Sequence, residues 1–205
     1  MAAIARRAPT PLGSENKGGP PLVWAYLNAA ADDIALGTVM AAAADGTVDE
    51  VAGTHVAPAF AQSGAGAWLG LLAQATGTVS AGDLAPVHAF LPGFLYEFNC
   101  DNTTFAAGDL YQNYGVEADA NFGHLVNTNH ALTTVERGVV IVALKSMYGQ
   151  FTTHAFSAQA ETSSVTSAGV SNSPYADQGI IGDTYARVLV SPSSDACVLT
   201  EGYLT

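Results

Sequence analysis

The segment TVSAGDL at residues 78–84 recurs as TFAAGDL at residues 104–110, displaced by 26 positions. Each copy is a turn of small residues with a glycine, Gly82 or Gly108, that tolerates a positive φ. An aspartate follows, whose carboxylate can accept hydrogen bonds from backbone N–H groups of the turn, and a leucine then opens a new apolar run. The stretch 77–126 that holds both copies is therefore predicted to form two successive β-hairpins.

Short apolar segments separated by turn residues continue on both sides of the repeat. Asp45-Gly46 and Pro92-Gly93 are turn signals. The segment 138–144 is β-branched and apolar without alternation, which predicts a strand buried on both faces. The other predicted strands are 22–27, 38–40, 47–48, 84–90, 94–98, 110–114, 121–126, 185–190 and 196–200. This spacing predicts an all-β protein, either a single β-barrel or a β-sandwich.

Residues 1–20 differ from the rest, and we interpret them as a flexible basic N-terminal arm that precedes a β domain over residues 21–205. Prolines and glycines disfavour regular structure in the arm. Arg6, Arg7 and Lys17 make it the only net-basic segment, which suits contact with a neighbouring subunit or an acidic partner. A merely disordered tail is the alternative. Within the β domain, residues 145–180 are predicted to be an irregular excursion from the core.

The segment 64–73 is rich in glycine and alanine and contains Trp68 and Leu69. Two interpretations stay open from the sequence, a short helix packed on the mouth of a barrel or a loop at an interface. In the second case Trp68 and Leu69 would contact a partner. The run is far shorter than the roughly 20 residues that a membrane-spanning helix needs, so no membrane partner is predicted.

Charged residues make up only 12% of the chain and hydrophobic residues 49%, whereas charged residues are about a quarter of a typical soluble domain. Because interface cores are depleted in charge, this composition favours a subunit whose surface is largely covered by partners. A monomer with a hydroxyl-rich surface is the alternative. The formal net charge is −12, and no Lys or Arg occurs between Lys17 and Arg137. The acidic body is therefore predicted not to bind nucleic acid.

Motifs for catalysis, cofactors and metals are absent from the sequence, so we predict neither an enzyme nor a cofactor. His124 and His130 lie six residues apart, and a metal site there would need carboxylates from elsewhere. Histidines that serve the fold are the favoured alternative. Cys100 and Cys197 give no disulfide framework and are interpreted as buried apolar residues. The N-terminal region lacks the apolar run of a signal peptide, which predicts a non-secreted protein.

Two AGDL turns, at residues 81–84 and 107–110, occur in a Gly-, Ala- and Thr-rich chain with few lysines and a late Val/Ile-rich strand. In these features residues 22–144 and 186–190 resemble the head decoration, or cement, proteins of tailed bacteriophages. The resemblance implies a compact β domain on the outer capsid, often a trimer, that clamps neighbouring major capsid subunits. It also implies that terminal arms extend the contact, which makes the arm with Arg6, Arg7 and Lys17 a candidate clamp.

We therefore expect a structural virion protein on the capsid surface, a homo-oligomer with a trimer favoured, whose partner is the major capsid protein. Another minor coat or tail protein is an alternative, because the same all-β sequence pattern would fit it. A carbohydrate-binding module is an alternative of a different class, because exposed Trp24, Trp68 or tyrosines would stack on sugars. A small β-barrel enzyme, with a site built from residues distant in sequence, is a further alternative.

Overall fold

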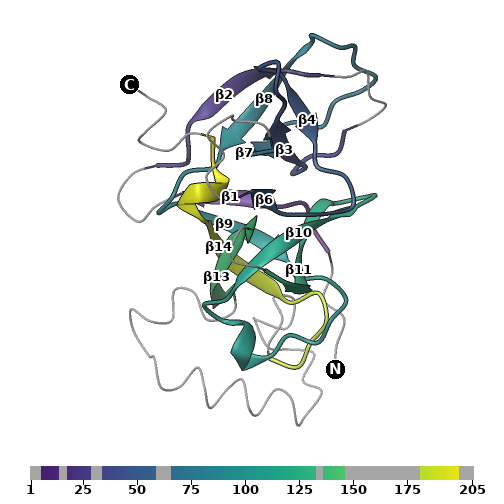
Figure 1. The fold of residues 1–205 in the computed structure, drawn as a ribbon. Helices are drawn as coiled ribbons and strands as arrows, with labels where there is room; N and C mark the ends of the chain where they lie inside the picture. The colour runs from purple at the N-terminus through teal and green to yellow at the C-terminus, as the bar shows by residue number, and fades with distance from the viewer. Residues whose placement is uncertain are drawn as a thin grey trace.

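The computed structural model describes residues 6–13, 18–28, 34–58, 66–132, 136–145 and 181–198. Over these ranges two antiparallel β-sheets, one of seven strands and one of five, pack as a β-sandwich (Figure 1). The predicted all-β fold is confirmed, in its sandwich form. No α-helix occurs in the described ranges, and short turns of 3₁₀-helix lie at Ala107–Asp109 and Ser194–Ala196.

The seven-stranded sheet has the order β1-β9-β14-β13-β10-β11, and β5 pairs with β10 beyond the end of β13. All its neighbouring strands are antiparallel. The strands are β1 (Thr10–Gly13), β5 (Thr54–His55), β9 (Leu95–Asn99), β10 (Asn113–Asp119), β11 (Gly123–Ala131), β13 (Val139–Leu144) and β14 (Arg187–Pro192).

The five-stranded sheet has the order β2-β8-β7-β3-β4, again with antiparallel neighbours. Its strands are β2 (Leu22–Tyr26), β3 (Val39–Ala42), β4 (Val48–Glu50), β7 (Trp68–Leu72) and β8 (Leu84–Ala89). The predicted turn at Asp45-Gly46 joins β3 to β4, with a φ of +83° at the glycine. A separate two-stranded ladder pairs β6 (Ala57–Pro58) with β12 (Glu136–Arg137).

The main hydrophobic core lies between the two sheets. Trp68 of β7 is fully buried there, and its ring lies 6.1 Å from the ring of Phe90. Phe90 in turn meets the ring of Tyr96 on β9 edge to face at 4.8 Å. The Tyr96 hydroxyl donates to the Ala89 carbonyl at 2.6 Å and accepts from the Leu91 N–H at 3.2 Å. These contacts fix the chain where it crosses from one sheet to the other.

A second hydrophobic core lies on the face of the five-stranded sheet that points away from the main core. The sheet curves so that its two edge strands approach each other, and this encloses the second core. Leu27 and Val48 form a parallel bridge between its two edges, and the Asn28 N–H donates to the Val48 carbonyl at 2.8 Å. The buried side chains of this core are Ala25, Leu27, Ile34, Met40, Val48, Leu69, Leu72, Ala85 and Val87. The sheet therefore packs apolar residues on both faces.

Both copies of the repeat form the same hydrogen-bonded turn. The Asp83 carboxylate accepts from the Ser80 N–H at 2.7 Å, and the Asp109 carboxylate accepts from the Ala106 N–H at 2.7 Å. A positive φ at the glycine occurs only in the first copy, where Gly82 has a φ of +88°. The prediction of two successive hairpins is wrong, because the first turn leads into β8 and the second toward β10, in different sheets.

Both predictions for the segment 64–73 are wrong over its residues 68–72. Its residues 68–72 form β7, between β8 and β3, so neither a helix nor an interface loop is present there. All five residues of β7 are buried, so no alternation of apolar and polar residues marked the strand. Conversely, β13 was predicted to be buried on both faces, but Val140, Val142 and Ala143 are only half-buried.

Part of the predicted arm is structured. Thr10–Gly13 form β1, which pairs with β9 at the edge of the seven-stranded sheet, so the expectation of no regular structure is wrong there. An edge strand tolerates Pro11 because only one side of it must pair. The predicted strand at 196–200 is also wrong in its described part, which holds the end of a 3₁₀ turn and a single bridge from Cys197 to Trp68. Lys17 and the segment 146–180 lie outside the described residues.

Candidate partner-binding surface

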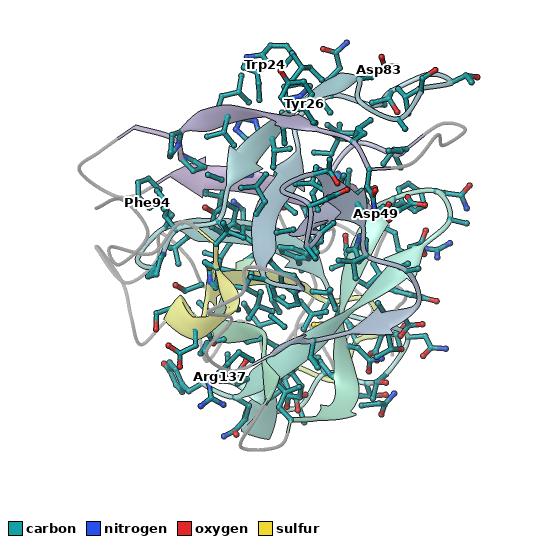
Figure 2. All side chains as sticks on the ribbon, turned by 45° about the horizontal axis from the view of Figure 1, so that its top comes forward. Trp24, Tyr26, Asp49, Asp83, Phe94 and Arg137 are labelled. Carbon is teal, nitrogen blue, oxygen red and sulfur yellow. The ribbon has the colours of Figure 1, made fainter. Side chains whose placement is uncertain are left out.

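Four large apolar side chains lie exposed together on the outer face of the five-stranded sheet. Leu22, Trp24 and Tyr26 alternate along β2 with exposed fractions of 50%, 63% and 57%, and Leu84 of β8 is 52% exposed. The register places Tyr26 opposite Leu84 on the neighbouring strand. Figure 2 shows Trp24 and Tyr26 on the outer side of the molecule. We call these four residues the aromatic face.

The alternation along β2 explains why the aromatic face is exposed. Successive side chains of a strand point to opposite sides, and Val23 and Ala25 point to the second core. Their neighbours Trp24 and Tyr26 must then point outward, although both are large and apolar. Contiguous exposed apolar side chains are unusual on a soluble monomer and mark contact surfaces. From the sequence, Trp24 is predicted only as a residue that would stack on sugars.

A groove with a volume of about 400 Å³ opens beside the aromatic face, between β2 and the β3–β4 hairpin. It forms because the bridge between Leu27 and Val48 joins the two edges of the sheet at one end only. Val23, Ala25, Leu69 and Val198 give it an apolar lining, and Trp24, Tyr26, Ala42, Ala43, Ala44, Gly46, Thr47 and Val48 complete it. An apolar hollow next to an apolar face makes this region a candidate contact surface.

Exposed acidic side chains lie on the segments that form this region, and none of the described Lys or Arg residues lies on them. Asp45, Asp49 and Glu50 of the β3–β4 hairpin and Asp83 before β8 are all exposed, and Figure 2 labels Asp49 and Asp83. The Asp45 carboxylate accepts from the Thr47 hydroxyl and N–H, which lowers the pKa of Asp45. The sequence has no Lys or Arg over residues 18–136, so the charged side chains on the described segments of this region are all carboxylates.

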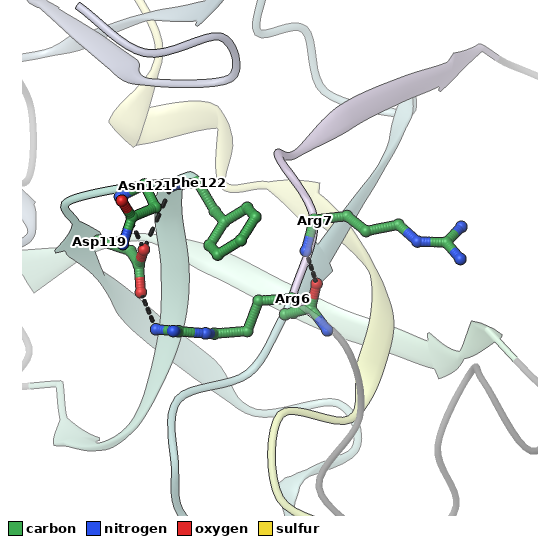
Figure 3. A network of polar contacts seen from close by, with 6 residues as sticks. Arg6, Arg7, Asp119, Asn121 and Phe122 are labelled. Atoms are coloured by element: carbon green, nitrogen blue, oxygen red, sulfur yellow. Dashed lines mark hydrogen bonds and ion pairs between the residues drawn. The ribbon is translucent and has the colours of Figure 1, made fainter.

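Two of the predicted clamp residues, Arg6 and Arg7, lie against the other sheet. The Arg6 guanidinium pairs with the Asp119 carboxylate and lies 5.2 Å from the ring centroid of Phe122 (Figure 3). The ring centroid of Tyr185 lies 5.2 Å from the same guanidinium. The carboxylate of Asp119 also accepts from the Phe122 N–H at 3.2 Å. The backbone N–H of Arg7 donates to Asn99 at 2.9 Å (Figure 3). Arg6 therefore contacts its own domain rather than extending from it.

On the seven-stranded sheet a buried carboxylate forms ion pairs with two further basic residues. Glu97 of β9 is only 5% exposed, and it pairs with Arg187 and, at 3.0 Å, with Lys145. Burial lowers the pKa of Arg187, and the nearby charge of Arg7 adds to that effect. Removing one partner of a buried ion pair leaves an uncompensated charge, so this cluster serves the fold. All described basic residues thus lie away from the aromatic face.

The structure separates the other two predicted site residues. Trp68 is fully buried in the main core, so the folded domain does not present it to a partner. Leu69 is buried in the second core but also lines the groove. The residues that the sequence analysis missed are Leu22, Tyr26 and Leu84. One signal in the sequence would have found them. In Leu22–Tyr26 the residues that point to one side of the strand and those that point to the other are all apolar, so one set has to be exposed if only one side is covered.

His124, the first histidine of the candidate metal site, is committed to the fold. Its Nδ1 accepts from the Val39 N–H at 3.0 Å and its Nε2 lies 2.8 Å from the Val51 carbonyl, to which it donates. The metal hypothesis for His124 is therefore wrong, because both ring nitrogens are already used. Among the described residues no group of three or more His, Cys, Asp or Glu is placed to hold a metal ion. Cys100 and Cys197 are both free and buried, as predicted.

Comparison with known proteins adds no relative. No protein-family profile matches the chain, and no curated protein or solved structure is significantly similar to it. The described residues also contain no helix long and apolar enough to cross a membrane. Over the described residues the protein is an all-β sandwich in which Leu22, Trp24, Tyr26 and Leu84 form an exposed apolar face.

Proposed function

We propose that this protein is a structural virion subunit that binds the outer surface of a viral capsid and stabilises its lattice of major capsid subunits. The observation that carries the proposal is the aromatic face, with Leu22, Trp24, Tyr26 and Leu84 uncovered on adjacent strands. Exposed apolar patches mark contact surfaces. The low fraction of charged residues, 12%, also supports a subunit that works in contact with others.

Stabilisation by such a subunit follows from mass action. A protein that binds the assembled lattice and not its separated subunits lowers the free energy of the assembled state.

The oligomer that we favour is a homo-trimer, in which several copies of the aromatic face would engage the lattice at once and gain avidity. Sedimentation equilibrium of the purified protein measures this directly. A strictly monomeric protein at all concentrations would contradict the trimer.

The aromatic face, rather than Arg6, is the proposed anchor. Wild-type protein is mixed with capsids that lack it, and the bound fraction is measured by co-sedimentation. We expect the double variant Trp24→Ser/Tyr26→Ser to bind at least about tenfold more weakly, because buried aromatic side chains dominate interface energies. Both residues are exposed, so the variant should keep the unfolding midpoint of the wild type.

The matched control is Tyr111→Ser. Tyr111 is 73% exposed, and its backbone N–H donates to Ile141 of the seven-stranded sheet. The Tyr111→Ser substitution removes an exposed aromatic ring away from the aromatic face, so capsid binding should stay within about twofold of the wild type. Equal binding by the double variant and the wild type would reject the aromatic face as the anchor. Absence of binding by the wild type would reject the capsid function itself.

A carbohydrate-binding module is the second candidate, and the exposure of Trp24 and Tyr26 on one side of β2 is the observation that favours it. Aromatic rings at alternating strand positions form a platform on which sugar rings stack. A glycan-binding screen separates the two candidates. Saturable binding to a soluble oligosaccharide, abolished in the double variant, would support the module in place of the capsid subunit.

A further inference from the structure

The outer edge of β2 carries backbone groups without a partner among the described residues. β2 is an edge strand of the five-stranded sheet. The Leu27 N–H donates to Asp83 and the Ala89 N–H donates to Pro21, each at 2.9 Å, so odd-numbered residues of this segment bond toward β8. In an antiparallel pair the intervening residues point their N–H and C=O groups the other way. Those residues are Leu22, Trp24 and Tyr26.

Asn28, the next even-numbered residue, shows the direction of the outward backbone groups of β2. Its N–H donates to the Val48 carbonyl of β4, where the two edges of the sheet meet. From there back toward Leu22 the edges diverge, and the groove lies between them. The parallel bridge between Leu27 and Val48 uses the Tyr26 carbonyl. The backbone groups that border the open, apolar groove without a partner among the described residues are therefore the N–H and C=O of Trp24 and the N–H of Tyr26. Exposed edge strands of this kind are usually protected by lysines, prolines or bulges, and Leu22–Tyr26 contains none.

We propose that β2 is an acceptor strand: an extended segment of another polypeptide pairs with its free edge and fills the groove. Alternate side chains of the added strand would point into the groove, whose apolar lining from Val23, Ala25 and Leu69 selects small aliphatic residues. The inference rests on the function proposed above, because it names how this protein holds a neighbouring subunit.

The charge around the groove selects the class of partner. The exposed acids Asp45, Asp49 and Glu50 lie on the hairpin that borders the groove, and Asp83 lies directly before β8. No Lys or Arg lies on this sheet, so the segment carries Lys or Arg beside its apolar residues. The chain's own residues 199–205 contain Glu201 and no basic residue. A second copy of β2 also brings no positive charge. The acceptor strand is therefore matched to a basic, extended segment from a different chain.

The two tryptophans of the chain provide a direct readout. Trp24 is exposed and lines the groove, whereas Trp68 is fully buried. The probe is a synthetic peptide of alternating valine and threonine with lysine pairs at both ends, and its control carries glutamate pairs instead. We expect the lysine peptide to shift the emission of Trp24 to shorter wavelength in a saturable way, up to millimolar peptide. The glutamate peptide should bind at least about fivefold more weakly.

Two variants at one position separate backbone pairing from side-chain contact. Tyr26→Ala removes the ring and keeps the N–H, whereas Tyr26→Pro removes both. Proline is tolerated there because the Tyr26 N–H faces the free edge and no bond to β8 is lost. We expect the lysine peptide to bind Tyr26→Pro about fivefold to tenfold more weakly than Tyr26→Ala, the effect of one lost backbone hydrogen bond. Far-ultraviolet circular dichroism checks that both variants are folded.

Either of two results would overturn the inference. One is the absence of a saturable shift with the lysine peptide, and the other is equal binding of that peptide by folded Tyr26→Pro and Tyr26→Ala. Capsid co-sedimentation of the same proteins keeps this outcome distinct from that of the proposed function. Capsid binding without peptide binding would reject the acceptor strand alone. Peptide binding without capsid binding would reject the capsid function alone.

Discussion

Asp83 and Asp109 hold equivalent places in the sequence repeat but have different surroundings. Each carboxylate accepts from the backbone N–H three residues before it. Asp109 has a second partner, because the Tyr114 hydroxyl donates to it at 2.8 Å. Burial raises the pKa of Tyr114, and the hydrogen bond to Asp109 raises it further. The same local turn is therefore coupled to the core in one copy only.

The two aspartates should respond differently to the same substitution. We expect Asp83→Ala to lower the free energy of unfolding by about 1 kcal/mol, the usual effect of losing a turn-capping side chain. Asp109→Ala should cost about 2–3 kcal/mol, because it also leaves the buried Tyr114 hydroxyl without its acceptor. Urea unfolding of both variants measures the difference. A double-mutant cycle with Tyr114→Phe is the control, and equal costs at the two aspartates would contradict the coupling.

At the scale of the elements, β7 depends on a glycine. A Cβ atom at Gly70 would lie 2.0 Å from the His88 carbonyl oxygen on β8, whereas one at Gly77 would meet nothing within 4 Å. Gly70→Ala should therefore separate β7 from β8 and cost at least about 3 kcal/mol, or prevent folding. Gly77→Ala has a compatible backbone and should stay within about 0.5 kcal/mol of the wild type. Thermal unfolding of the two variants tests the contrast, which comparable losses in both would contradict.

The elements also show how far the sequence could predict this fold. Strands with turn signals on both sides, such as Leu22–Tyr26 and Leu95–Asn99, were found within a residue or two. β7 was missed because a strand covered on both faces has no alternating pattern. β1 was missed because Pro9 and Pro11 suggested an irregular arm, although proline is tolerated at a sheet edge.

The candidate surface was harder to predict than the fold. Trp24 and Trp68 are both followed by apolar residues in apolar strands, yet one is 63% exposed and the other is fully buried. What decides between them is the position of each strand in its sheet, β2 at the edge and β7 inside. Strand order comes from contacts between distant residues. A single strand read alone does not contain it.

Across the whole molecule, charge and apolar surface are divided between the sheets. The basic residues of the described chain gather on the seven-stranded sheet and its neighbouring ladder, where Glu97, Asp119 and Asp195 pair with them. The five-stranded sheet keeps exposed acids and the aromatic face without a base. This division places every described ion pair on one side of the molecule and leaves the acids of the five-stranded sheet without a Lys or Arg on their own sheet.

The shared core makes a further prediction about the whole molecule. Cys100, which follows β9, and Cys197, which bridges to Trp68 of β7, both belong to the core between the sheets. Burial raises the pKa of Cys100, and it raises the pKa of Cys197 to about 12. Neither native thiol should react with a thiol reagent near neutral pH, because the reactive species is the thiolate. Reaction then requires opening of the sandwich.

If the two sheets open as one unit, the two cysteines should react with the same opening free energy, equal to the global free energy of unfolding. Single-cysteine variants Cys100→Ala and Cys197→Ala, each compared with its own urea unfolding curve, measure the two values. A markedly lower opening free energy at Cys197 would show instead that the contact with β7 opens locally, and the five-stranded sheet would then be an independent unit of unfolding.

The same two thiols also make the free energy of unfolding depend on pH. Both favour the neutral form in the fold, so the free energy of unfolding should stay constant below the unfolded thiol pKa of 9.0 and fall as the pH rises above it.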